Sequence, residues 1–254
     1  MTLPSNAEND LWIRRFHQAP DAPVRLLCLP HAGGSASFYF PVSAALSPRI
    51  EVLAAQYPGR QDRRAEPSIG TVAELADRIH AVLGTERDDR PLAIFGHSMG
   101  ATLGFELARR LEAAGRPPAV LFVSGRRGPA THREETVHLR DDDGLVAELK
   151  SLSGTNTALL GDEEILRMIL PAIRNDYRAI ETYRRPEGGP LAAPIVALIG
   201  DDDVKSTVEE AKAWAEETSG AFTLKVFPGG HFYLAAHQRA VLAEITDALA
   251  AHAS

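Results

Sequence analysis

The feature that most constrains this chain is a serine, Ser98, flanked by Gly96 and Gly100 in the stretch PLAIFGHSMGATLGFELARRL from Pro91 to Leu111. The apolar residues before it are typical of a short buried strand, and leucines at helical spacing follow it. We therefore expect Ser98 to be the pivot of a tight strand-to-helix turn, in which glycines remove the Cβ atoms that would clash. The free N–H groups of the following helix would favour a developing negative charge. The pattern indicates a serine nucleophile.

Composition narrows the class of protein. The chain has 254 residues, of which 44% are hydrophobic, so we expect a single domain over residues 1–254. A net charge of −7 argues against a nucleic-acid partner or an anionic membrane surface. The only cysteine, Cys28, lies in an apolar run and is expected in the core. The N-terminal stretch lacks the pattern of a signal peptide, which predicts a cytoplasmic protein.

Strand and helix patterns alternate along the chain, which predicts an α/β fold with a mostly parallel central sheet flanked by helices. Apolar runs predict strands at Val24–Leu29, Glu51–Gln56, Leu92–Phe95, Ala119–Val123, Ile195–Ile199 and Thr223–Phe227. Helical spacing predicts helices at Val72–Leu83, Ala101–Ala114, Val208–Thr218 and Ala236–Ala251.

One region interrupts this alternation. Residues 131–189 contain no convincing strand, but the segments DDGLVAELKSL and DEEILRMILPAIRNDYRAIETY have helical patterns. Because long insertions in compact domains are more often functional, we interpret residues 131–189 as a helical lid. The alternative is a plain structural excursion.

The base and acid that a serine nucleophile requires have predicted places, because catalytic groups of open α/β sheets collect at the carboxyl ends of strands. Asp201, Asp202 and Asp203 follow one predicted strand, and His231 follows another. The chain order Ser98, Asp203, His231 is the one expected of α/β-hydrolases. His231 would act as general base and Asp203 would orient it, with Asp202 as the alternative acid.

Two backbone N–H groups should stabilise the oxyanion. One belongs to Met99, directly after the nucleophile. The loop PHAGG follows the first predicted strand, and we assign the second donor to Ala32, with a simple glycine turn as the alternative. The histidines are not spaced with acids or cysteines as metal ligands, and no phosphate-binding glycine loop is present, so we expect no metal and no cofactor.

These motifs together resemble the type II, or discrete, thioesterases that accompany polyketide synthases and nonribosomal peptide synthetases, within the α/β-hydrolase superfamily. The resemblance covers nearly the whole chain and rests on six segments in order: LPHAGGSASFYF, AQYPGRQDRRAEP, FGHSMGATLGFELARRL, ILPAIRNDYRAIETYR, IGDDDV and GGHFYL. The QYPGR element discriminates best against general esterases. One departure is residues 174–177, Arg-Asn-Asp-Tyr, where the family often has Arg-Ala-Asp-Phe.

The resemblance implies hydrolysis of acyl thioesters from the phosphopantetheine arm of carrier proteins, which clears stalled or wrongly loaded units. It gives Ser98, Asp203 and His231 the catalytic roles and Ala32 and Met99 the oxyanion hole. It implies carrier domains as partners, and nothing in the sequence demands more than a monomer. The alternatives are a general carboxylesterase or lipase, a medium-chain fatty acyl thioesterase, and a non-catalytic interaction module, which an intact triad disfavours.

Carrier proteins are generally acidic, so an acidic enzyme needs a local basic surface to bind one. Candidate arginines follow the PGR element and another predicted strand. They are Arg60, Arg63, Arg64, Arg126 and Arg127. The alternative is that they are solvated loop charges or members of internal salt bridges.

Overall fold

The structure, a computed structural model, describes residues 6–85, 88–152 and 163–252. Its centre is a seven-stranded sheet in the order β1-β3-β2-β4-β5-β6-β7. The strands are β1 Ile13–Arg14, β2 Val24–Leu29, β3 Ile50–Ala55, β4 Leu92–His97, β5 Leu121–Ser124, β6 Ile195–Gly200 and β7 Phe222–Phe227. β1 pairs with β3 in antiparallel fashion, and every other pair is parallel.

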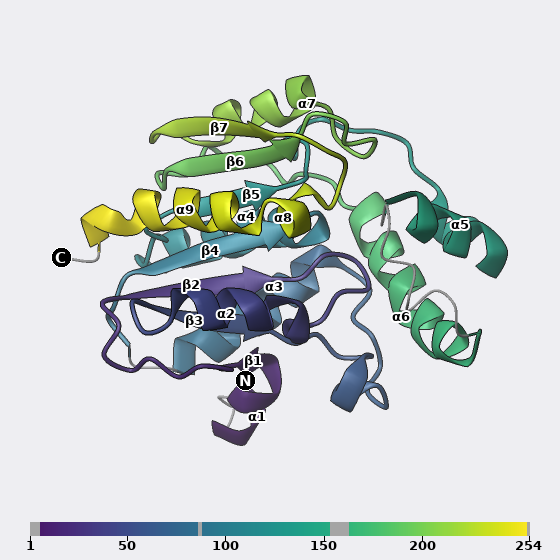
Figure 1. Ribbon diagram of the computed structural model, residues 1–254, viewed down its shortest axis with the longest axis horizontal. Helices are drawn as coiled ribbons and strands as arrows, with labels where there is room; N and C mark the ends of the chain where they lie inside the picture. The colour runs from purple at the N-terminus through teal and green to yellow at the C-terminus, as the bar shows by residue number, and fades with distance from the viewer. Residues whose placement is uncertain (1–5, 86–87, 153–162, 253–254) are drawn as a thin grey trace.

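Helices cover both faces of the sheet (Figure 1). They are α1 Asn6–Trp12, α2 Phe40–Leu46, α3 Val72–Thr85, α4 Met99–Ala113, α5 Asp142–Leu152, α6 Glu163–Glu181, α7 Val208–Lys212, α8 Tyr233–Ala236 and α9 Gln238–Leu249. Short 3₁₀ helices lie at Ala36–Tyr39, Gln61–Arg63, Val137–Leu139, Ala213–Glu217 and Ala250–His252. The predicted α/β architecture is confirmed.

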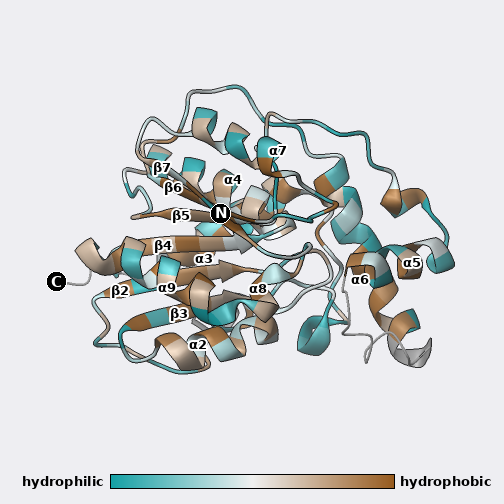
Figure 2. Cartoon of the chain, turned by 45° about the horizontal axis from the view of Figure 1, so that its top comes forward, coloured by the Kyte–Doolittle hydropathy of each residue, from teal (hydrophilic) through white to brown (hydrophobic). Residues whose placement is uncertain are grey.

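Two apolar clusters, one on each face, hold the layers together. Leu27 and Leu29 of β2 pack in the cluster that includes α3 and α4. Leu26 and Cys28 of the same strand pack in the cluster that includes α8 and α9. The residues of β2, β3, β4, β5 and β6 are buried on both faces of the sheet, which explains why these strands are mainly apolar (Figure 2). Arg25 of β2 and Glu51 of β3 are buried exceptions. Cys28 is a core residue, as predicted.

The predicted strands all exist. β2 has the predicted bounds and the others have shifted ends, such as β3 at Ile50–Ala55 and β5 at Leu121–Ser124. Two predicted helices are divided. Val208–Thr218 is α7 followed by a 3₁₀ helix, and Ala236–Ala251 includes the end of α8 and the whole of α9. The sequence reasoning missed α1, α2 and β1. β1 could not be recognised because it has only two residues, shows no periodic pattern and is defined by its tertiary pairing with β3.

The predicted insertion contains a 3₁₀ turn, α5 and α6, and no strand in its described part. Figure 1 shows α5 and α6 beyond the carboxyl ends of the parallel strands, where β2, β4 and β6 all point. Leu145 of α5 and Ile173 and Tyr177 of α6 form a separate small apolar cluster, and Ala32 packs against it. The division into one domain with a lid over residues 131–189 stays a prediction.

No helix in the described ranges is long and apolar enough to cross a membrane.

Candidate active site

The predicted turn at Ser98 is present. β4 ends at His97 and α4 begins at Met99, and Ser98 between them has φ 55° and ψ −115°. A Cβ atom on Gly96 would lie 2.0 Å from the Gly100 carbonyl oxygen, and one on Gly100 would lie 2.1 Å from that of Leu29. Both positions therefore require glycine. A serine with positive φ carries strain of about 1–3 kcal/mol, which persists because the surrounding β4 and α4 define the turn.

His231 and Asp203 meet at the ends of β7 and β6. His231 Nδ1 lies 2.8 Å from Asp203 Oδ2 and 3.0 Å from Oδ1, and both side chains are buried. The Lys205 N–H donates to Asp203 Oδ1 at 2.8 Å, which fixes the carboxylate from the other side. Asp202 is exposed, and the carboxylate of Asp201 accepts the Gly229 N–H at 2.8 Å. Of the three aspartates, the geometry brings Asp203 to His231.

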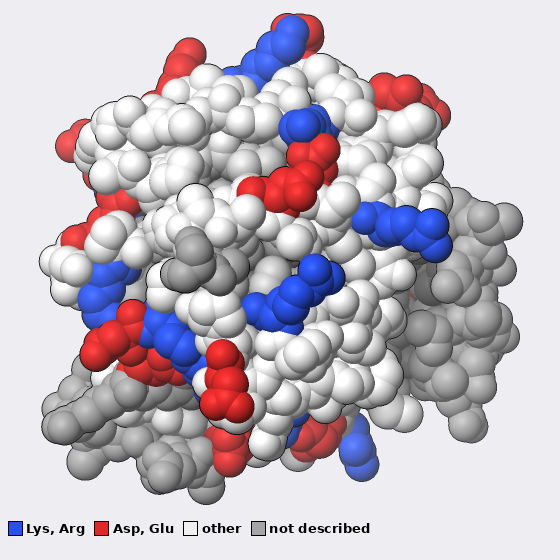
Figure 3. All heavy atoms as spheres, turned by 60° about the vertical axis from the view of Figure 1, so that its left-hand side comes forward, with Lys and Arg blue, Asp and Glu red and all other residues white. Residues whose placement is uncertain are grey.

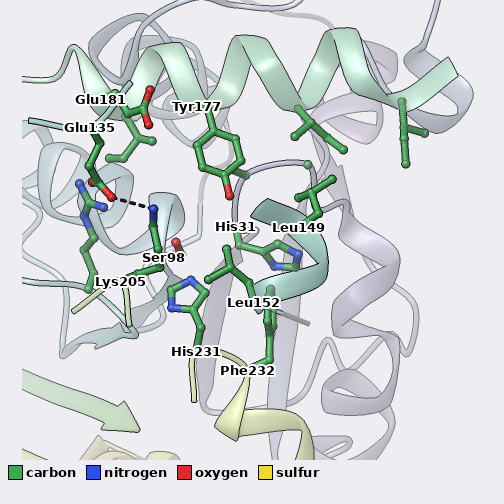
Figure 4. A pocket seen from close by; sticks show the side chains of 16 residues that line it. His31, Ser98, Glu135, Leu149, Leu152, Tyr177, Glu181, Lys205, His231 and Phe232 are labelled. Carbon is green, nitrogen blue, oxygen red and sulfur yellow. Dashed lines mark ion pairs between the residues drawn. The ribbon is translucent and has the colours of Figure 1, made fainter. Parts of the chain in front are cut away.

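Ser98 and His231 line a cavity of about 160 Å³. Figure 4 shows them next to one another, with polar side chains on one side of the pocket and Leu149 and Leu152 on the other. The apolar side chains of the lining come mainly from α5 and α6, namely Leu149, Leu152, Ile169, Ile173 and Ile180. The charged ones are Arg126, Glu135, Glu181 and Lys205. The pocket therefore has an apolar and a charged half, with Ser98 and His231 between them.

The loop after β2 supplies the other predicted group. Ala32 lines the cavity, and Met99 is the first residue of α4. The N–H of the neighbouring Gly33 donates to Asp176 Oδ2 of α6 at 2.8 Å. The loop that carries Ala32 is thus held by a helix of the insertion, a contact that the sequence analysis did not identify.

Asp176 also binds Arg60 of the PGR element. Arg60 Nη1 and Nη2 donate to the two carboxylate oxygens of Asp176 at 2.6 and 2.9 Å, and Arg60 Nη1 donates to the Gly34 carbonyl at 3.0 Å. Arg60 is 8% exposed and Asp176 is 1% exposed. The bidentate pair thus joins the PGR element, the loop after β2 and α6 into one buried unit.

Three of the five arginines proposed as carrier contacts are buried, and that part of the hypothesis is wrong. Arg60 pairs with Asp176, Arg63 with Glu66, and Arg127 with Glu135. The alternative of internal salt bridges holds for these three. Arg64 is exposed, and Arg126 lines the cavity.

We expect Asp176→Ala to destabilise the protein by about 3–5 kcal/mol, because it leaves the buried guanidinium of Arg60 without its counter-ion. Urea unfolding would measure the change. The matched control is Asp142→Ala, which removes the ion pair between Asp142 and Arg174. The side chain of Asp142 is 69% exposed. Such a surface pair contributes about 0–1 kcal/mol. Equal effects of the two variants would show that the Arg60 pair is not a structural tie.

Two further histidines adjoin His231, and the sequence analysis gave neither a role. The ring of His97 lies 5.0 Å from that of His231 and 5.8 Å from that of His31, between centroids. His97 Nδ1 lies 2.9 Å from the Ser124 hydroxyl, which contacts the Tyr233 hydroxyl at 2.6 Å. The available signals were their positions in the sequence, since His97 directly precedes Ser98 and His31 lies in the PHAGG loop.

Both histidines stay uncharged at neutral pH. Burial, followed by the charge of His231, lowers the pKa of His31 to about 3. The same two causes hold the pKa of His97 well below its ordinary value. His231 therefore has no second imidazolium beside it when it accepts a proton, so its charged form is not opposed by these neighbours.

Comparisons with known proteins identify the family of this chain. The thioesterase domain family matches residues 24–249. The probable cadicidin biosynthesis thioesterase of Streptomyces griseus is 57% identical over 238 residues, which are 94% of this chain and 66% of that protein. Thioesterase PikA5 of Streptomyces venezuelae is 48% identical over 247 residues, or 97% of this chain and 88% of that protein.

The solved structure of the type II thioesterase BorB from the borrelidin biosynthetic cluster superposes with a TM-score of 0.90 at 56% identity. The superposition covers 94% of this chain and 98% of that one, and it confirms the predicted α/β-hydrolase fold. With a family match over most of its length and relatives that resemble it from end to end, this chain belongs to the thioesterase domain family.

Proposed function

We propose that this chain is a type II thioesterase that removes acyl groups from the phosphopantetheine arms of carrier proteins in polyketide or nonribosomal peptide biosynthesis. The observation that carries the proposal is that Ser98 and His231 line one cavity, with Asp203 hydrogen-bonded behind His231, in a chain of the thioesterase family. The name of the cadicidin relative places that protein in cadicidin biosynthesis, and BorB comes from the borrelidin biosynthetic cluster, which supports the editing role.

In the proposed mechanism, Ser98 Oγ attacks the thioester carbonyl carbon while His231 accepts the hydroxyl proton. The carbonyl oxygen becomes an oxyanion bound by the N–H groups of Ala32 and Met99. The C–S bond then breaks, and the thiol leaves with the proton from His231. Water, deprotonated by His231, attacks the acyl-serine, and the free acid departs as Ser98 regains its proton. Asp203 holds His231 Nδ1–H and stabilises the imidazolium.

The cavity favours a short acyl group. Its volume of about 160 Å³ is below the roughly 300–1,000 Å³ typical of pockets for drug-sized ligands. Its apolar half would contact the acyl carbons through side chains such as Leu149 and Leu152. This volume favours the editing thioesterase over the medium-chain fatty acyl thioesterase.

The test of function compares one acetyl group on three leaving groups: a phosphopantetheine-loaded carrier protein, a small thiol and a simple alcohol. We expect the highest kcat/KM with the carrier protein and the lowest with the oxygen ester. A parallel series from acetyl to decanoyl should show falling kcat/KM with chain length. Preference for the oxygen ester would favour the carboxylesterase, and preference for decanoyl would favour the fatty acyl thioesterase.

We further propose that the enzyme acts as a cytoplasmic monomer without metal or cofactor, and that it contacts carrier domains but neither nucleic acid nor membrane. The net charge of −7 supports the exclusion of polyanionic partners. On the face that Figure 3 brings forward, basic and acidic side chains are interspersed over the described residues. Arg64 is exposed and stays a candidate contact for the carrier.

A further inference from the structure

A second cavity of about 300 Å³ adjoins the catalytic one. The two cavities share three lining residues, Arg126, Ile180 and Glu181. Arg126 follows β5, and its carbonyl accepts the indole N–H of Trp214 at 2.8 Å, which fixes the backbone at this boundary. The shared residues place the two cavities next to one another.

The lining of the second cavity is strongly basic. Its basic lining residues are Arg126, Arg127, Arg133, Arg184, Arg185 and His132, against one acid, Glu181. The Glu181 carboxylate is occupied, because it accepts the N–H groups of Val137 and His138 at 3.0 and 3.1 Å and also contacts the His138 ring. The charge of Glu181 raises the pKa of Arg126, but burial of the guanidinium outweighs this effect.

Three of the five arginines are neutralised by acids outside the cavity lining: Arg127 by Glu135, Arg133 by Glu210 and Arg185 by Glu217. Across residues 6–85, 88–152 and 163–252, neither Arg126 nor Arg184 forms an ion pair with a carboxylate. Arg184 Nη1 donates to the carbonyls of Glu181 and Tyr183 at 3.0 and 2.8 Å.

The guanidinium of Arg126 is poorly solvated. Burial, followed by the charge of Arg127, lowers the pKa of its guanidinium to about 10. The nearby carboxylates do not offset this burial, so a bound anion would supply the missing counter-charge. A guanidinium fork matches the oxygens of a phosphate group better than other cationic side chains do.

The position of the second cavity relative to the nucleophile follows from α4. Thr102 lines this cavity and lies about 6 Å along the helix from Ser98, at 1.5 Å per residue. Tyr183 lines it too, and its hydroxyl donates to Glu106 Oε1 at 2.8 Å. Glu106 is about 12 Å along α4 from Ser98. Residues that line the second cavity therefore lie on α4, or contact it, one to two helical turns beyond the nucleophile.

We propose that the second cavity binds the phosphate group of the phosphopantetheine arm through Arg126 and Arg184. The arm would then reach Ser98 through the charged half of the catalytic cavity, and the acyl group would point to the apolar half near Leu149 and Leu152. This inference rests on the proposed function, because it assumes that the thioester is carried on such an arm.

The test uses two acetyl thioesters that differ only in the phosphate, acetyl-phosphopantetheine and acetyl-pantetheine. We expect wild type to prefer the phosphorylated substrate by about tenfold or more in kcat/KM, mostly through KM, as a charge-assisted contact of about 1.4 kcal/mol would give. Arg184→Gln and Arg126→Gln should each lower this preference several-fold. Arg184→Lys should recover part of it, because the charge returns without the planar fork.

The matched control is Arg239→Gln, an exposed arginine of α9 that lines neither cavity, which should keep the full preference. The proposal fails if wild type shows no preference. It also fails if the cavity variants lose activity equally on both substrates. Calorimetric titration of phosphopantetheine and pantetheine into the same proteins requires no turnover. If the proposed function is wrong, neither thioester will be hydrolysed. If only the phosphate site is wrong, hydrolysis will persist and the titrations will show equal affinity for phosphopantetheine and pantetheine.

Discussion

Ser98→Ala should lower kcat for hydrolysis of an acetyl thioester by roughly 10⁴- to 10⁶-fold, the range found when the nucleophile of a serine triad is removed. The remaining rate would come from the oxyanion donors and from binding alone. A single-turnover assay with radiolabelled acetyl substrate would measure both the rate and the acyl-enzyme, which should be absent from the variant.

The fold should tolerate this change, because alanine keeps the Cβ atom of Ser98 and the glycines that accommodate the turn are unchanged. Unfolding measured in parallel should therefore show a small change in stability. Retention of more than about 1% of wild-type kcat would point to a different nucleophile, since a loss of at least 10⁴ is expected. Cys28 would not be that nucleophile, because it is fully buried and burial raises the pKa of its thiol.

Asp203→Asn should lower kcat by about 10⁴-fold, as the equivalent change does in other serine triads. The amide cannot stabilise the charged imidazolium, and it can present its NH₂ group to His231 Nδ1, which favours the wrong tautomer. Steady-state kinetics with the acetyl thioester would measure the loss. We expect the effect in kcat rather than in KM, because Asp203 does not line the cavity.

Asp202→Asn is the matched control, since the neighbouring carboxylate is exposed and follows the same strand. It should change kcat by less than about threefold, because exposed charges away from a site have small effects. If Asp202→Asn had the larger effect, the acid assigned from the geometry would be wrong, and the alternative from the sequence would replace it.

The sequence alone determined the features that arise within a few residues. The turn at Ser98 requires glycine at position 96 because of a local approach to the Gly100 carbonyl, whereas the approach of Gly100 to the Leu29 carbonyl of β2 is a tertiary contact. The buried parallel strands were recognisable as apolar runs, because a strand covered on both faces must be apolar on both. The order Ser98, Asp203, His231 was also predictable, because parallel strands end at one edge of the sheet.

The tertiary structure decided which charged residues meet. Asp202 and Asp203 follow the same strand, and only the direction of the chain after β6 brings one of them to His231. Arg60 and Asp176 are 116 positions apart, so no local pattern predicts their pair. An arginine has the same charge on a surface, in a buried ion pair or beside a cavity. The packing of distant segments around it sets its solvation and its partners, and thereby its role.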